Sequence, residues 1–230
     1  MPVGFESIGD TGRYQVDSNF KNLALIRSGQ LLSQQYTNGS TTNTRPTRVA
    51  ITLNEGEILA LACTELCALG SKIGSTAYVY VDSAAGQMVE YYIFKPGGNT
   101  SSTFGLQVFN EDGELTFDSG WDLFDVRYIL SGYVTVSLSA GRKYAFVHSQ
   151  IGTSITYTQV VNGIPPNSLT SHVRRTMFSA VKISGNSVVC QLSNVDVAAT
   201  PPSSGAGQPY SETYSNNATP VALIIDVTGF

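Results

Sequence analysis

Residues 105–119 read GLQVFNEDGELTFDS, and this stretch decides the fold class. Two short runs, in each of which apolar residues alternate with polar ones, flank a turn at Asp112-Gly113. An Asp-Gly pair between such runs is a strong hairpin signal, because glycine adopts the positive φ that a tight turn needs. The stretch therefore predicts a β-hairpin that ends at Asp118-Ser119.

The opening of the chain repeats this design. Residues 4–18 read GFESIGDTGRYQVDS, and a shift of about 101 residues places Gly4, Gly12 and Asp17-Ser18 on the equivalent positions of the later stretch. Residues 48–62 match residues 133–147 in the same way, with alternating apolar residues and a turn glycine in both. Two matches in the same order predict an internal duplication. The second offset is smaller, which indicates an insertion in the first half.

The rest of the chain consists of short alternating runs separated by turn residues, and no segment has a convincing helical periodicity. This pattern predicts an all-β protein. We expect two tandem, related β-sandwich-like domains of short antiparallel strands, at 1–100 and 103–230. A single larger sandwich built from both halves is the alternative. The polar residues 30–45 are expected to form a long loop or an extended hairpin tip, and residues 220–227 a strand inside a sheet or between subunits.

Composition excludes several classes of function. The 230 residues carry a net charge of −4 and only 13% charged residues, so the basic footprint of a nucleic-acid-binding protein is absent. The longest apolar stretch is too short to span a bilayer, and the start lacks a signal-peptide pattern. We therefore expect no membrane span and no export by a standard signal. Three cysteines are too few for a disulfide framework and predict free, buried thiols.

The sequence offers little catalytic chemistry. None of the common hydrolase, metalloprotease or nucleotide-binding motifs is present. His148 ends an apolar strand and is expected in a strand-end or core role, whereas His172 lies in an expected polar loop and is expected at the surface. Asp118, like Asp17, is interpreted as a carboxylate that caps a turn rather than a glycosidase acid. We therefore expect no enzymatic activity, and no catalytic residue, metal site or cofactor.

Aromatic residues in polar segments are the candidates for binding. Tyrosine among Ser, Gly and Asn is typical of recognition loops, because it adds contact area at a low entropic cost. Trp121 is instead expected to be a core anchor. The predicted binding residues are Tyr36, Asn38, Tyr210 and Tyr214.

The stretch at 105–119 resembles a motif of tail proteins of tailed bacteriophages, G-L-x-V-[FY]-[ND]-x-x-G-x-[LV]-x-F-D-S. The opening GFESIGDTGRYQVDSNFKNLALIRSG is similar to the start of such proteins, with Asp17, Asn19 and Asn22 in the places of their D-x-N-x-x-N pattern. The resemblance covers about 25 residues in each half. Two copies in one chain depart from the single copy expected of that family.

The resemblance implies a structural, non-enzymatic virion protein of the tail tip, baseplate or tail fibre, assembled in the cytoplasm of the host bacterium. It also implies other phage tail proteins as partners and a homo-oligomer, with a trimer favoured. The loops expected at 30–47, 162–172 and 200–218 would then contact neighbouring subunits or a host receptor, either a surface glycan or a protein. The alternatives are a head-decoration or head-fibre virion protein and a carbohydrate-binding module.

Overall fold

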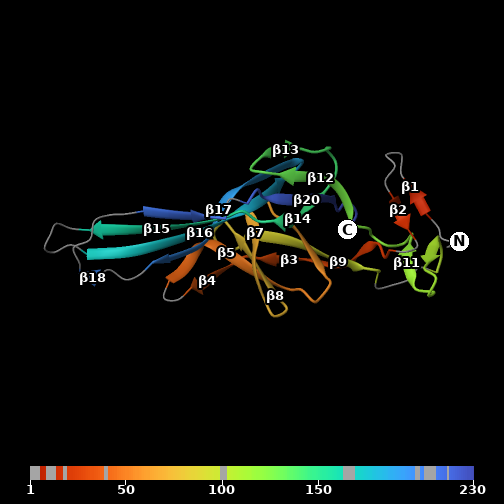
Figure 1. Cartoon of the computed structure of the whole chain (residues 1–230), viewed down its shortest axis with the longest axis horizontal. Helices are drawn as coiled ribbons and strands as arrows, with labels where there is room; N and C mark the ends of the chain where they lie inside the picture. Colours follow the sequence, from red (N-terminus) through yellow and green to blue (C-terminus); the bar gives the residue numbers. More distant parts are fainter. Residues whose placement is uncertain are drawn as a thin grey trace.

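A computed structural model of the chain describes residues 6–8, 14–17, 20–38, 41–98, 103–162, 169–199, 203–204, 211–216 and 218–230. All regular secondary structure in these residues is β-strand, which confirms the all-β class. Two short hairpins lie at one end, two packed sheets form the middle, and an arm of long strands extends at the other end (Figure 1).

The two hairpins have the same geometry. They are formed by β1 (Glu6–Ile8) with β2 (Tyr14–Asp17) and by β10 (Gln107–Phe109) with β11 (Leu115–Asp118). Every cross-strand pair of the first recurs in the second, from Glu6↔Asp17 to its counterpart Gln107↔Asp118, and a register shift precedes the last pair of each. The predicted hairpin at 105–119 is therefore confirmed, and its repeat at 4–18 shares its register.

Local contacts explain the second hairpin. Gly113 has a φ of 77°, as the tight turn requires. The carboxylate of Asp118 is buried and accepts a hydrogen bond from the Gly120 backbone N–H at 2.8 Å, so the predicted capping role is confirmed. The two hairpins pack on each other through a small apolar cluster formed by Val16, Val108, Phe117 and Leu123.

Both large sheets are antiparallel and draw strands from both halves of the chain. The six-stranded sheet has the order β12-β20-β14-β6-β9-β3, and the ten-stranded sheet has the main order β13-β17-β16-β7-β8-β5-β4. In the first sheet the strands are β3 (Leu23–Leu32), β6 (Ile58–Ala62), β9 (Met88–Pro96), β12 (Asp125–Ser131), β14 (Tyr144–Gln150) and β20 (Val221–Asp226). In the second they are β4 (Gln34–Asn38), β5 (Thr41–Thr52), β7 (Cys67–Ile73), β8 (Thr76–Val81), β13 (Thr135–Ser137), β16 (Leu169–Ser184) and β17 (Ser187–Ala199), with β15 (Thr153–Asn162), β18 (Ser203–Ser204) and β19 (Ser211–Ser215) attached to β16 and β15.

The strand orders are those of two copies related by an approximate twofold axis. In the six-stranded sheet, β6 of the first half pairs with β14 of the second, and β9 and β3 follow on one side as β20 and β12 do on the other. The pair at the centre is Leu61↔Phe146, two positions that the sequence match at offset 85 already aligns. Gly56 and Gly141, aligned by the same match, have φ values of 75° and 76° in equivalent turns.

The duplication thus has a clear structural counterpart, but the arrangement differs from two tandem sandwiches. Each half supplies part of both sheets, and one apolar core runs through both halves between the sheets. Leu61 and Val79 of the first half and Phe146 and Ile224 of the second are all buried in that core. The architecture is the alternative one, a single larger sandwich, in which the break near residue 100 separates two repeats rather than two cores.

Residues 30–45 were expected to form a long loop or an extended hairpin tip, and the second form is confirmed, because β4 pairs with β5 as an antiparallel hairpin. The β4–β5 hairpin curls back against β17, although the two are far apart in the strand order. The hydroxyl of Tyr36 donates a hydrogen bond to the Val195 carbonyl at 2.5 Å across this contact. Long-range packing of this kind stabilises a polar segment that local sequence does not mark as a strand.

Trp121, which was expected to be a core anchor, is half-buried beside Gly98 and belongs to none of the buried clusters. Its indole lies directly over Gly98, where an added Cβ would come within 2.3 Å of the indole Nε1. Replacing Gly98 by alanine should displace the ring and cost about 1–3 kcal/mol of stability. Because Trp121 is the single tryptophan, a red shift of its fluorescence would report the displacement. An unchanged emission spectrum would contradict this packing, and the cost should shrink in a Trp121→Phe background.

Candidate functional site

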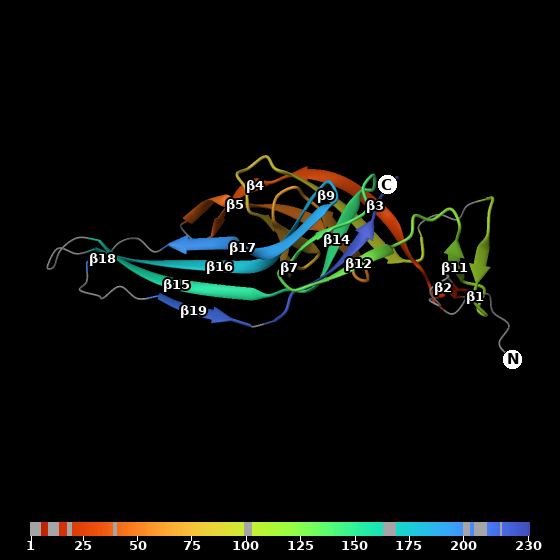
Figure 2. The same ribbon diagram turned by 90° about the horizontal axis from the view of Figure 1, so that it is seen from above.

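The arm consists of β15, β18 and β19 together with residues 169–178 of β16 and 193–199 of β17. It extends away from the core of the sandwich, on the side opposite the paired hairpins (Figures 1 and 2). β15 lies between β16 and β19, and β17 continues the sheet on the far side of β16. The arm therefore presents broad sheet faces at a distance from the structural core.

One face of the arm carries two tyrosines side by side, and we call it the tyrosine face. Tyr157 on β15 lies opposite Arg174 of β16 and Glu212 of β19, and Ile155 lies opposite Tyr214. Directly opposed residues of an antiparallel pair point to the same side of the sheet. The register therefore assigns these five side chains to one surface.

The two tyrosine rings form an edge-to-face pair. Their centroids are 6.0 Å apart at an interplanar angle of 81°. The Tyr214 hydroxyl donates a hydrogen bond to Glu212 Oε2 at 2.9 Å. Tyr214 is 58% exposed and Tyr157 39%, whereas Tyr92 and Tyr144 of the sandwich are both only 3% exposed. Together with Ile155 and Glu212, the two rings line an open recess of about 430 Å³.

A second recess of about 250 Å³ lies where this face meets the β4–β5 hairpin. Arg48 is stacked between two aromatic rings there, with its guanidinium 4.7 Å from the Tyr36 centroid and 4.5 Å from that of Tyr78. Asp196, which shares this recess, forms an ion pair with Arg174 at 2.7 Å. Burial raises the pKa of the Tyr36 hydroxyl above its ordinary value. Because these groups are already engaged with one another, we interpret this recess as structural.

The predicted binding residues fall in different places. Tyr214 is exposed on the tyrosine face. Tyr36 is only 7% exposed, and its role is to hold the β4–β5 hairpin against β17. Asn38 ends β4, where it pairs with Thr41, and Tyr210 lies outside the described residues.

Sequence reasoning missed the partners of Tyr214. The alternation of Ile155 and Tyr157 in the sequence would have placed both on one face of a strand. The missing signal was the pairing of β15 with β19. The segment 200–218 was expected to be a loop, and the structure shows that it contains the strand β19. Without that pairing, nothing in the sequence indicates that Glu212 and Tyr157 lie next to each other.

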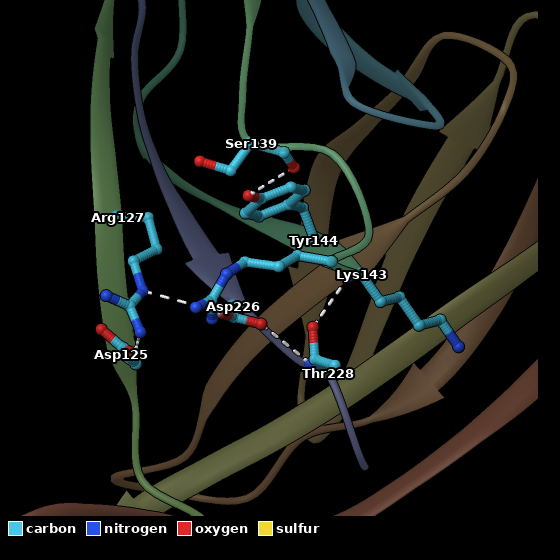
Figure 3. A network of polar contacts seen from close by, with 8 residues as sticks. Asp125, Arg127, Ser139, Lys143, Tyr144, Asp226 and Thr228 are labelled. Carbon is cyan, nitrogen blue, oxygen red and sulfur yellow. Dashed lines mark hydrogen bonds and ion pairs between the residues drawn. The ribbon is translucent and has the colours of Figure 1, made fainter.

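The acidic residues serve structural roles instead. Asp226, at the end of β20, accepts hydrogen bonds from the Thr228 backbone N–H and from Arg142, and Arg127 Nε lies 3.6 Å away (Figure 3). Burial opposes the ionisation of Asp226, but the hydrogen bonds from Thr228 and Arg142 outweigh it and hold the pKa of this carboxyl below its usual value. The network ties β12, β20 and the turn before β14 together at one end of the sandwich.

The two histidines differ in exposure. His148 is half-buried, with both ring nitrogens inaccessible, and packs edge-to-face against Phe146, whereas His172 is exposed, as expected. Cys63, Cys67 and Cys190 are all free and buried, which confirms the expectation for the thiols. Within the described ranges, no three His, Cys, Asp or Glu side chains gather as metal ligands. The same ranges contain no helix long and apolar enough to cross a membrane.

Comparison with known proteins adds no relative to this picture. No protein-family model, curated protein or solved structure matches the chain. The interpretation of the site therefore rests on its residues and their geometry.

Proposed function

We propose that the chain is a non-enzymatic structural protein of a tailed-bacteriophage virion, located in the tail tip, baseplate or tail fibre. The observation that carries the proposal is the pair of hairpins. The two stretches that resemble the opening of phage tail proteins form hairpins with the same strand register. These hairpins pack on each other at one end of the molecule. A motif whose two copies keep the same geometry is a structural module.

The rest of the molecule is compatible with such a role. The sandwich contains ion pairs between its strands and turns, such as the Asp226 network and the bidentate pair of Arg27 with Glu57. The arm presents the tyrosine face away from the hairpins. In this proposal the hairpins attach to other tail proteins, the chain forms a homo-oligomer, favoured as a trimer, and the arm contacts a host-surface glycan or protein.

The location is tested by immunogold electron microscopy of intact particles, with antibodies raised against the purified chain. We expect label on the tail and co-sedimentation of the chain with the particles. An antibody against the major capsid protein serves as the control for head labelling. Label on the head would replace this proposal with the head-decoration or head-fibre alternative, and absence of the chain from purified particles would reject both.

A further inference from the structure

The recess on the tyrosine face combines an aromatic surface with a carboxylate. We propose that Ile155, Tyr157, Glu212 and Tyr214 form a binding site for a pyranose unit of a neutral glycan. This inference rests on the proposed function for its setting, and it names the ligand class of the arm's contact surface. The volume of about 430 Å³ lies within the range of small-molecule sites, and its open form suits a unit within a longer sugar chain.

The aromatic rings supply the apolar part of the recognition. Tyrosine offers a large flat surface with few rotatable bonds, so little conformational entropy is lost when a ligand stacks on it. Here the rings are also held in advance, because Tyr214 packs against Tyr157 and its hydroxyl is bonded to Glu212. Such preorganisation lowers the cost of binding. The C–H face of a pyranose ring is a matching apolar surface.

Glu212 determines which polar groups the ligand must present. An ionised carboxylate only accepts hydrogen bonds and has about four lone-pair positions, of which the Tyr214 hydroxyl uses one. The ligand must therefore bring donors, and the hydroxyl groups of a sugar are such donors. An anionic sugar would be repelled by the carboxylate and by the net charge of −4 of the whole chain.

A cationic ligand fits less well. Aromatic cages bind quaternary ammonium groups between ring faces. The two rings here meet edge to face with centroids 6.0 Å apart, so the edge of one ring occupies the space that such a cation needs.

The experiment uses the full-length chain on an array of neutral, anionic and choline-bearing glycans, followed by calorimetric titration with the best neutral oligosaccharide. Tyr214→Ala and Tyr157→Ala should each weaken its binding by at least about fivefold. Glu212→Gln, which keeps the shape but removes the charged acceptor, should weaken it by at least about tenfold. The matched control is Tyr128→Ala, which removes a 42%-exposed tyrosine from the edge strand β12 and should leave binding unchanged.

Thermal unfolding checks that each variant is folded. If Tyr214→Ala does not fold, Tyr214→Phe replaces it, because phenylalanine keeps the aromatic ring and removes only the hydroxyl that bonds Glu212. Binding of anionic or choline-bearing glycans instead, or of none, would overturn the inference, as would equal losses in Tyr128→Ala and Tyr214→Ala. Particle labelling remains an independent test. A tail-located chain that binds no glycan overturns only this inference, and a glycan-binding chain absent from particles overturns only the proposed function.

Discussion

Replacing Phe146 by alanine is expected to lower the free energy of unfolding by about 3–5 kcal/mol. Phe146 is fully buried in the core shared by both halves, and its strand pairs with β20 on one side and with β6 on the other. The alanine would leave a cavity at the seam between the two repeats, which the surrounding strands cannot close without breaking their register. Urea unfolding followed by circular dichroism measures the loss.

Phe104→Ala is the matched control, because it makes the same change at a side chain that is 92% exposed. Its effect should stay within about 0.5 kcal/mol. Since one core connects the two halves, the Phe146→Ala variant should still unfold in a single transition at lower denaturant. Two separate transitions, with half of the chain surviving the first, would contradict a shared core and restore the tandem arrangement.

The second large effect is a loss of stability in mild acid through His148. Burial lowers the pKa of His148 to about 4, compared with 6.5 for an ordinary histidine. Within the described residues neither ring nitrogen forms a hydrogen bond, and the nearby Cys67 backbone opposes the shift only in part. Below pH 6.5 His148 therefore binds a proton in the unfolded chain but stays neutral in the folded chain. The folded state should lose about 3 kcal/mol between pH 6.5 and 4.

Unfolding free energies at half-unit steps between pH 7 and 4.5 test this expectation. Carboxylates enter at the acid end of this window. The pKa of Glu57, for example, is lowered from 4.5 to about 2, chiefly by its hydrogen bond from Arg27, so most of its contribution is lost below pH 4.5 and the loss between pH 6.5 and 5 reports the histidine. His148→Leu should flatten the profile. A parent profile that is flat from pH 6.5 to 4.5 would refute a buried neutral His148.

Local signals predicted the elements but not their partners. The Asp-Gly turn, the alternation around Gly56 and Gly141, and the apolar strand at 220–227 all produced the expected strands, because each depends on residues close in sequence. The shared sheets depend on pairs such as Leu61 with Phe146, which no local pattern encodes. The same limit applies at residues 30–45, where an extended hairpin was one of the two expected forms but its contact with β17, through Tyr36 and Val195, was not predicted.

The candidate site shows the same division. Tyr214 was found because tyrosine in a polar segment is conspicuous. Its neighbours were not found, because Ile155 and Glu212 become part of one surface only through the pairing of β15 with β19. The exposure of a side chain could not be predicted from the sequence either. Tyr36 and Tyr214 both lie in polar segments, but Tyr36 is buried and Tyr214 is exposed in the structure.

The twofold seam also bears on how such a chain arises. Two identical half-length chains that pair β6 with β6 and β7 with β7 would form a closed homodimer with the same two sheets. When two such chains are fused, the pairing of the halves no longer depends on protein concentration. The two contacting surfaces also no longer have to be identical in sequence. Each repeat could then change in sequence independently of the other. The first repeat has the additional strand β4 and the second has the arm, so the arm is a feature that only one of the two repeats acquired.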